Sequence, residues 1–335
     1  MIRKNASLAA IVSSILTAIL LSVLSSRDPM GALHSFIFSP LTNVYHLGNM
    51  LSYASLLLLT GGGVVLAFSS GSFNLGGEGQ TYLAALITTI VLSYSVPLPL
   101  AFAAAAAAAG AMAGLSGLLR YRLGADELIT SFLLSAATIP VVDYLISGPL
   151  RDRGSSLLAT PFIRESARLS RILEPSQLST VIILALAATV VLYVVLRYTI
   201  FGYEVRIIGQ NRDLARYGGL PIGTLTILPL TLSGVWHGLA GAALVTGVHY
   251  RAITGFSGGL GWNGIAVALI ARNNPALLIP AALLFSYLNT GSSTAVLEHQ
   301  VTWEFGAILQ AVVFLFVTAE TLRRRKGRNP GGEST

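Results

Sequence analysis

The chain has 335 residues, of which 53% are hydrophobic and only 10% are charged, whereas soluble domains carry about 25% charged residues. This deficit argues against a water-soluble domain. The absence of cysteine excludes disulfides, thiol catalysis and thiolate metal sites. The formal net charge of +7 comes mostly from arginines that flank apolar segments. That distribution is typical of a membrane protein, so no nucleic-acid partner is expected.

The first apolar stretch covers residues 8–26 and follows a basic start. Its 19 residues are long enough to cross about 30 Å of hydrocarbon. No clear A-x-A cleavage site follows, so we interpret it as a retained helix rather than a cleaved signal peptide. An all-α polytopic membrane protein with about ten transmembrane helices is predicted. The other nine segments are 50–70, 73–95, 97–119, 127–147, 178–196, 222–249, 257–271, 276–296 and 302–320.

Two of these segments are irregular. Segment 73–95 opens with a glycine-rich stretch, and segment 257–271 is short and rich in glycine. Non-helical backbone at membrane depth is tolerated only where protein or a water-filled cavity covers it. Transport pathways are often built from such helices. We therefore expect some helices to be broken or re-entrant.

An even number of crossings places both termini on the same side of the membrane. With the termini inside, fourteen of the 21 basic residues lie in inner segments, as the positive-inside rule requires. We therefore predict that both termini are cytoplasmic. Residues 1–322 then form the transmembrane domain, and 323–335 form a basic cytoplasmic tail.

A long polar loop, 148–177, lies on the outer side in this topology. It holds five arginines, three acidic residues and three prolines. Its size and polarity suit a surface that meets another protein outside the membrane, and they equally suit a solvated connection.

The sharpest local feature is the stretch 72–80, which places an amide and a carboxylate in a glycine-rich turn before a helix. A charge within the membrane is costly and often functional, which favours a place in a transport path. The alternative is local: Asn74 caps the helix, and Glu78 stabilises its positive amino end.

A second feature is the cytoplasmic segment 206–221. Asn211 is a candidate helix cap, Gly218 a candidate helix end, and Pro221 opens the next segment. A short helix is expected between them, with Leu214 and Tyr217 on one face. That helix would dock into a cytoplasmic partner, or its arginines would contact lipid headgroups.

Short motifs bear on two catalytic interpretations. Residues 255–258 fit the G-x-S-G pattern of rhomboid-type proteases, with Ser257 as the nucleophile, but the only later histidine is His299, in a polar loop. A P-loop needs a lysine after glycine, and neither lysine has that context. We therefore expect no catalytic residue in this chain. An ion-coupled secondary transporter is a further alternative for its function.

Several motifs in order resemble the inner-membrane permeases of branched-chain amino acid, ribose and nucleoside importers. Residues 73–80 are similar to the signature F-N-I-G-x-E-G-Q, and 264–275 to the nucleoside-type G-I-A-V-A-L-L-G-R-x-x-P. Gly77 stands where alanine is common, and the helix around 135–137 lacks an asparagine often found there. The resemblance covers residues 50–320, with shorter matches at 127–130, 147–152, 209–219 and 255–257.

The resemblance implies a permease subunit of an ABC importer in the bacterial cytoplasmic (inner) membrane, in contact with membrane lipid. Its solute would be a nucleoside, with riboflavin or a simple sugar as alternatives. No metal and no cofactor are implied in this chain. The residues expected along the solute path are Phe73, Asn74, Glu78, Gln80 and Asn263.

The resemblance also implies partner chains. An ATPase subunit would bind ATP and Mg²⁺. An extracytoplasmic solute-binding lipoprotein would deliver the solute, and a second homologous permease would form a heterodimer with this chain. The residues expected to contact the ATPase are Gln210, Asn211, Arg212, Asp213, Leu214, Arg216 and Tyr217.

Overall fold

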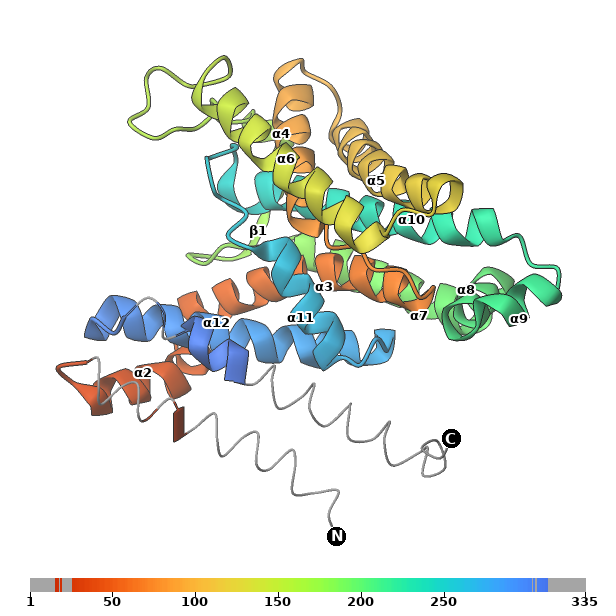
Figure 1. Ribbon diagram of the computed structural model, residues 1–335. Coiled ribbons are helices and arrows are strands. Elements are labelled where there is room, and N and C mark those ends of the chain that lie inside the picture. The colour runs from red at the N-terminus through yellow and green to blue at the C-terminus, as the bar shows by residue number, and fades with distance from the viewer. Residues whose placement is uncertain (1–15, 18, 20–25, 303, 305, 313–335) are drawn as a thin grey trace, which may run out of the picture.

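In a computed structural model that describes residues 16–17, 19, 26–302, 304 and 306–312, the chain is a bundle of helices (Figure 1). Six of the described helices are long and apolar enough to cross a membrane. An all-α polytopic membrane fold is thereby confirmed. These spans are α3 (Val44–Ser69), α5 (Leu98–Leu123), α6 (Glu127–Ser147), α7 (Val181–Tyr198), α10 (Ile222–Leu244) continued by a π-turn Val245–His249, and a 3₁₀ turn Pro275–Leu277 continued by α12 (Leu278–His299).

The remaining elements are shorter. Two of them, α4 (Gly77–Ser93) and α11 (Leu260–Ile270), begin inside the bundle. The others are α2 (Pro29–Thr42), α8 (Ile200–Gln210), α9 (Arg212–Tyr217), a 3₁₀ turn Glu165–Ala167, and an antiparallel pair of strands, β1 (Arg171–Leu173) and β2 (Leu178–Ser179).

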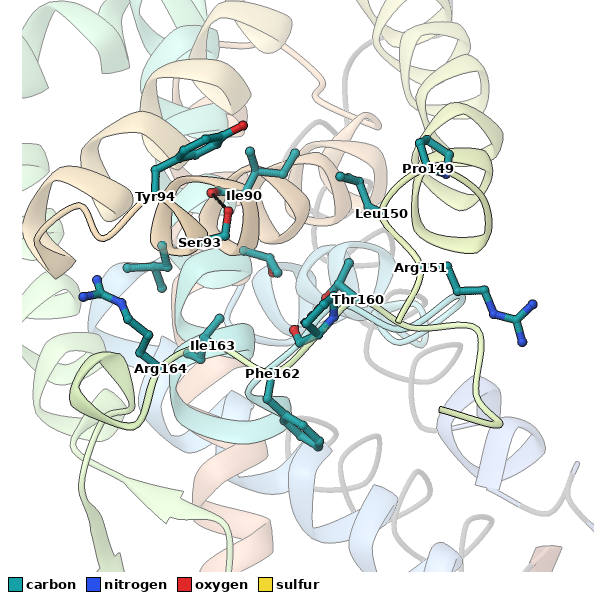
Figure 2. A pocket seen from close by; sticks show the side chains of 13 residues that line it. Ile90, Ser93, Tyr94, Pro149, Leu150, Arg151, Thr160, Phe162, Ile163 and Arg164 are labelled. Atoms are coloured by element: carbon teal, nitrogen blue, oxygen red, sulfur yellow. Dashed lines mark hydrogen bonds between the residues drawn. The ribbon is translucent and has the colours of Figure 1, made fainter. Parts of the chain in front are cut away.

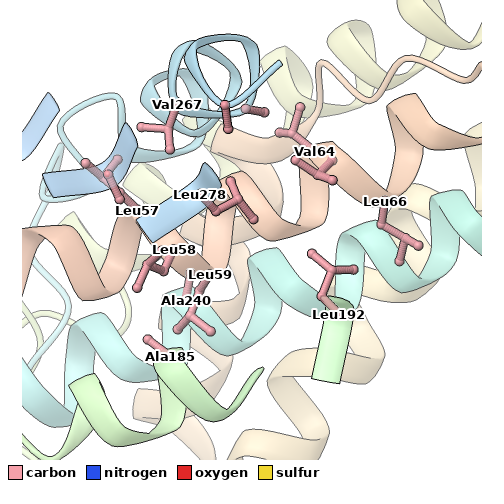
Figure 3. Packing of buried hydrophobic residues seen from close by; sticks show 14 of the residues in the cluster. Leu57, Leu58, Leu59, Val64, Leu66, Ala185, Leu192, Ala240, Val267 and Leu278 are labelled. Atoms are coloured by element: carbon pink, nitrogen blue, oxygen red, sulfur yellow. The ribbon is translucent and has the colours of Figure 1, made fainter. Parts of the chain in front are cut away.

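Helix α3 lies at the centre of the bundle and packs against α7, α10, α11 and α12 (Figure 1). Figure 3 shows its side chains Leu57, Leu58 and Leu59 among residues from those helices. Helix α10 packs almost backbone to backbone on α5: a Cβ added at Gly234 would lie 2.3 Å from the Ala109 carbonyl oxygen. Small residues allow this approach, as they do in other membrane proteins.

The two ends of the bundle differ. At one, which we call the loop end, residues 158–169 hydrogen-bond with 246–254. At the other, the α9 end, α8 and α9 lie beside residues 70–72 and Arg120. Only 22% of the most apolar stretch of α6 and 28% of that of α7 is buried. The outer faces of these two helices are therefore available to lipid or to another subunit.

The expected segments match the structure closely in places and differ in others. The predicted spans 127–147 and 222–249 have the observed bounds. Helix α2 was not predicted, because it has only 14 residues and contains Pro40. Helix α8 was also missed. The predicted helix 8–26 lies largely outside the described residues, as do 313–320 of the last segment and the tail 323–335. The total of ten crossings and the side of the termini stay predictions.

Candidate functional site: two broken helices that meet at Glu78

The amino termini of α4 and α11 meet within the bundle. Helix α11 has 11 residues and is therefore about 16 Å long, roughly half the hydrocarbon thickness. A Cβ added at Gly261 would lie 2.2 Å from the backbone nitrogen of Glu78, so the two helix starts are in direct contact. The chain enters α4 from the α9 end and enters α11 from the loop end.

The carboxylate of Glu78 lies between these two helix starts. Its Oε1 accepts hydrogen bonds from the Ser257 hydroxyl at 2.5 Å and from the Gly259 N–H at 3.0 Å, and its Oε2 accepts from the Gly261 N–H at 2.7 Å. We call these three bonds the Glu78 joint. Two facing amino termini repel each other electrostatically. A carboxylate between them offsets that repulsion and satisfies amide groups that a helix start leaves unpaired.

The loop before α11 can reach Glu78 because of its glycines. Gly258 has φ +55° and Gly259 has φ +79°, a left-handed conformation that glycine adopts without steric cost. This turn aims the N–H groups of Gly259 and Gly261 at one carboxylate. A side chain with a β-carbon at either turn position would strain the joint.

Asn74 and Gln80 form a closed amide pair beside the joint. Each side-chain NH₂ group donates to the oxygen of the other at 2.9 Å. Asn74 also donates to the Ser233 hydroxyl of α10 at 3.0 Å and accepts from the Gly76 N–H at 3.0 Å. Both amide side chains are fully buried. The pair therefore fixes the non-helical residues before α4 against α10.

Helix α6 satisfies the other backbone donors of this segment. Glu127, Ser131 and Ser135 are spaced four residues apart and therefore share one face of the helix. Their oxygens accept from the N–H groups of Phe73 at 3.3 Å, Leu75 at 3.0 Å and Gly79 at 2.8 Å respectively. Buried backbone donors need such partners. These three hydrogen bonds stabilise the non-helical backbone before α4 within the membrane-spanning bundle.

Positive charge gathers at the α9 end of the same segment. Arg120 donates to Glu127 at 2.5 Å and to the Ser72 hydroxyl at 2.9 Å. A cavity of about 580 Å³ is lined by Phe73, Arg120, Glu127 and Arg212, among others. Partial burial, and then the nearby charges of Arg120 and Arg216, lower the pKa of the Arg212 guanidinium. Rearrangement of α9 would therefore change the electrostatics next to the entrance of α4.

His237 of α10 accounts for the glycine at position 77. Its ring is fully buried, with Nδ1 2.8 Å from the Ser233 carbonyl oxygen. Its Nε2 has no hydrogen-bond partner within the described part of the chain. A Cβ added at Gly77 would lie 2.5 Å from this Nε2. The imidazole thus occupies the space that an alanine methyl group would take.

The structure brings three of the five predicted path residues together. Asn74, Glu78 and Gln80 are buried and hydrogen-bonded as described, whereas Phe73 is 45% exposed, with its ring against Phe68. Asn263, on α11, instead donates to the Tyr53 hydroxyl at 2.7 Å. Their role in a solute path stays a prediction. Ser131, Ser135, Ser233 and His237 were not among the predicted site residues, and the four-residue spacing from Glu127 was a signal for the first two.

Helix α9 has the expected caps. The Asn211 side chain accepts from the Leu214 N–H at 2.9 Å, and Gly218 ends the helix. Leu214 and Tyr217 are exposed, the latter 90%. A six-residue helix therefore presents an apolar and an aromatic side chain away from the bundle.

A pocket of about 480 Å³ opens at the loop end, between the end of α4 and residues 149–164. Figure 2 shows Arg151 and Arg164 on opposite sides of it, with both guanidinium groups pointing outwards. Tyr94 and Phe162 are exposed at its rim. The pocket is thus flanked by positive charge and aromatic surface.

We expect Glu78→Gln to lower the free energy of unfolding by about 1–3 kcal/mol, because an amide NH₂ would face a donor that the carboxylate now satisfies. The thermal midpoint in detergent measures this change. The matched control is Glu165→Gln, since the Glu165 side chain is 89% exposed. Equal midpoints for the two variants would contradict a structural role for the joint.

We expect Gly77→Ala to destabilise the protein by about 1–3 kcal/mol through overpacking against His237. Combining it with His237→Ala should cost less than the sum of the two single changes, because the new methyl group would fill part of the space that the imidazole leaves. Unfolding midpoints of the four proteins give the coupling. Gly154→Ala, in an exposed loop, is the control. Strict additivity would show that the two positions do not compete for space.

Residues 46–318 match the family described as "Branched-chain amino acid transport system / permease component". The "Probable riboflavin import permease protein RfuC" of Treponema pallidum (strain Nichols) is 32% identical, with 89% of this chain and 81% of that protein covered. The "Glucose ABC transporter permease protein TsgB13" of Haloferax volcanii is 31% identical, with 89% and 82% covered. The "Guanosine ABC transporter permease protein NupP" of Bacillus subtilis (strain 168) is 29% identical, with 90% and 88% covered.

The family match includes every element of the site, from the segment before α4 to the start of α11. The protease alternative gains no support, because the Ser257 hydroxyl donates to Glu78. The chain is a multi-pass protein of the inner membrane. It belongs to the family of branched-chain amino acid transport system permease components, as a non-catalytic membrane subunit of an ABC transporter whose ATPase is a separate chain.

Proposed function

We propose that this chain is a permease subunit of an importer for a nucleoside or a related solute that joins a flat ring to a sugar-like chain. The observation that carries the proposal is the pair of relatives named for riboflavin and guanosine, at 32% and 29% identity over most of the chain. Both named solutes combine a fused nitrogen heterocycle with a five-carbon polyol or sugar. A simple sugar is the second candidate, because a relative at 31% identity is named for glucose.

The proposed importer divides its work among several chains. A binding lipoprotein delivers the solute at the loop end, and a second permease, homologous to this one, completes the path as a heterodimer. The largely unburied faces of α6 and α7 support a further subunit beside this chain. The partner ATPase binds ATP and Mg²⁺ at the α9 end, which is then cytoplasmic. Nucleotide can shift the permease between states only through a difference in affinity for those states.

Two kinds of residue serve the proposed solute path. Asn74, Glu78 and Gln80 are hydrogen-bonded inside the bundle, so they act by holding the broken helices in place. Phe73 and Asn263 are less buried and stay the candidates for direct contact with solute. The arginines and aromatic rings around the loop-end pocket support docking of the binding protein there.

The proposed contact with the ATPase is helix α9. Its exposed Leu214 and Tyr217 suit insertion into an apolar groove of a partner, the mode in which a short helix presents anchors three or four residues apart. Gln210, Arg212, Asp213 and Arg216 surround these anchors in sequence and provide polar contacts at the rim. Asn211 holds the helix start by capping it.

We expect the double variant Leu214→Ala/Tyr217→Ala to lose at least about 2 kcal/mol of ATPase affinity, a loss typical of central interface anchors. Co-purification of the ATPase with the permease, quantified by light scattering in detergent, measures it. Tyr94→Ala is the matched control, because Tyr94 is also strongly exposed but lies at the loop end. Undiminished co-purification of the double variant would reject α9 as the coupling helix.

We expect uptake of labelled guanosine or riboflavin into proteoliposomes that hold the permeases, the ATPase and the binding protein, and only when ATP is enclosed with the ATPase. Glucose uptake without uptake of either ring solute would favour the sugar candidate instead. Uptake by this chain alone, driven by an ion gradient, would replace the importer with a secondary transporter.

A further inference from the structure

The non-helical segment before α11 faces water or protein rather than lipid. Gly255, Gly258 and Gly259 all have positive φ, and no atom lies within 4 Å of a Cβ added at any of them. Gly255 and Gly258 are exposed. This segment leads into α11, whose first turns lie beside the middle part of the 26-residue span α3, since a Cβ added at Gly264 would lie 2.7 Å from the Thr60 side chain. Irregular backbone exposed to lipid does not occur at that depth.

An aromatic pair stands next to this open segment. Trp262, in the first turn of α11, is 37% exposed, and Phe132 of α6 is 43% exposed. Their ring centroids lie 6.0 Å apart, with the planes inclined at 55°. The residue before each ring is held in place: Gly261 donates to Glu78 in the joint, and Ser131, on α6, accepts from the Leu75 N–H. The pair is thus held at a fixed place beside the break between the two helices.

The position of Trp262 argues against a role as a lipid anchor. Tryptophans that anchor membrane proteins lie in the headgroup regions at the two interfaces, whereas Trp262 lies in the first turn of α11, beside the middle part of the span α3. The partly exposed indole of Trp262 stands next to backbone that cannot face lipid. We therefore expect it to border the side of the bundle along which a polar solute would cross. Its flat apolar face suits stacking on another flat ring.

We propose that Phe132 and Trp262 form a stacking platform for the flat fused heterocycle of the solute. This inference rests on the proposed function and narrows the solute to one that carries a flat heterocycle. Stacking of a base on an aromatic side chain strengthens binding, and it tolerates differences between heterocycles because each of them has a flat π-face. A platform of this kind would therefore accept both purine and isoalloxazine rings. A simple sugar, which has no flat heterocycle, would gain much less binding from it.

The transport test compares maximal uptake at saturating binding protein. Trp262→Leu and Phe132→Leu should each lower the rate for guanosine or riboflavin about tenfold, and Trp262→Phe should keep most of it. Tyr144→Leu, an exposed aromatic elsewhere on α6, should transport at the wild-type rate. A wild-type rate in Trp262→Leu would overturn the proposal. So would dissociation of the two permeases in Trp262→Leu, seen by size exclusion, since the pair would then be a subunit contact.

A binding test needs no transport. The chain contains three tryptophans, so Trp236→Phe/Trp303→Phe leaves Trp262 as the one tryptophan of this chain, and subtracting the emission of a complex that also carries Trp262→Phe removes the contribution of the partner chains. Riboflavin or guanosine, added to the purified permease–ATPase complex, should quench the Trp262 emission after correction for absorbance, whereas glucose should not. Absence of quenching, or equal quenching by glucose, would reject the platform. Failure of the wild-type importer to take up any ring solute would reject the proposed function separately.

Discussion

The fold of this chain depends on one buried carboxylate that accepts hydrogen bonds across the gap between two helix starts. Glu78 is 7% exposed and belongs to the first turn of α4, yet its three partners lie at the entrance of α11. Without it, two positive helix ends would face each other in a medium that screens charge poorly. The amide pair of Asn74 and Gln80 and the oxygens along α6 complete the same task for the chain that leads into α4.

This arrangement joins segments that come from opposite ends of the bundle. Residues 70–76 approach from the α9 end, and 250–259 approach from the loop end. Separating them would leave a buried carboxylate and backbone donors unpaired, at about 1–3 kcal/mol for each lost partner. We therefore expect the two broken helices to move as a unit. A displacement of α9, which lies beside Arg120 and the entrance of α4, can reach the loop end through that unit.

The sequence was informative wherever a property is local. Composition and segment length indicated the membrane class, and the caps of α9 followed from Asn211 and Gly218. The glycine stretches before α4 and α11 marked the two broken helices. What the sequence left open depends on contacts between distant segments. Nothing near Glu78 indicates that its partners are Ser257, Gly259 and Gly261, and nothing near Gly77 indicates that His237 fills the adjacent space. Helix α2 escaped because its short stretch with an internal proline resembles a connection, and it is stabilised by packing on α12.

The most direct test of the Glu78 joint is hydrogen–deuterium exchange of the intact protein, followed by mass spectrometry of peptides that cover residues 255–262. Amide exchange reports local opening, and the N–H groups of Gly259 and Gly261 are the donors to the carboxylate. In Glu78→Gln, exchange in 255–262 should accelerate relative to the wild type, while exchange in α12 should not change. Unchanged exchange in 255–262 would contradict the account, because those amides would then not depend on Glu78.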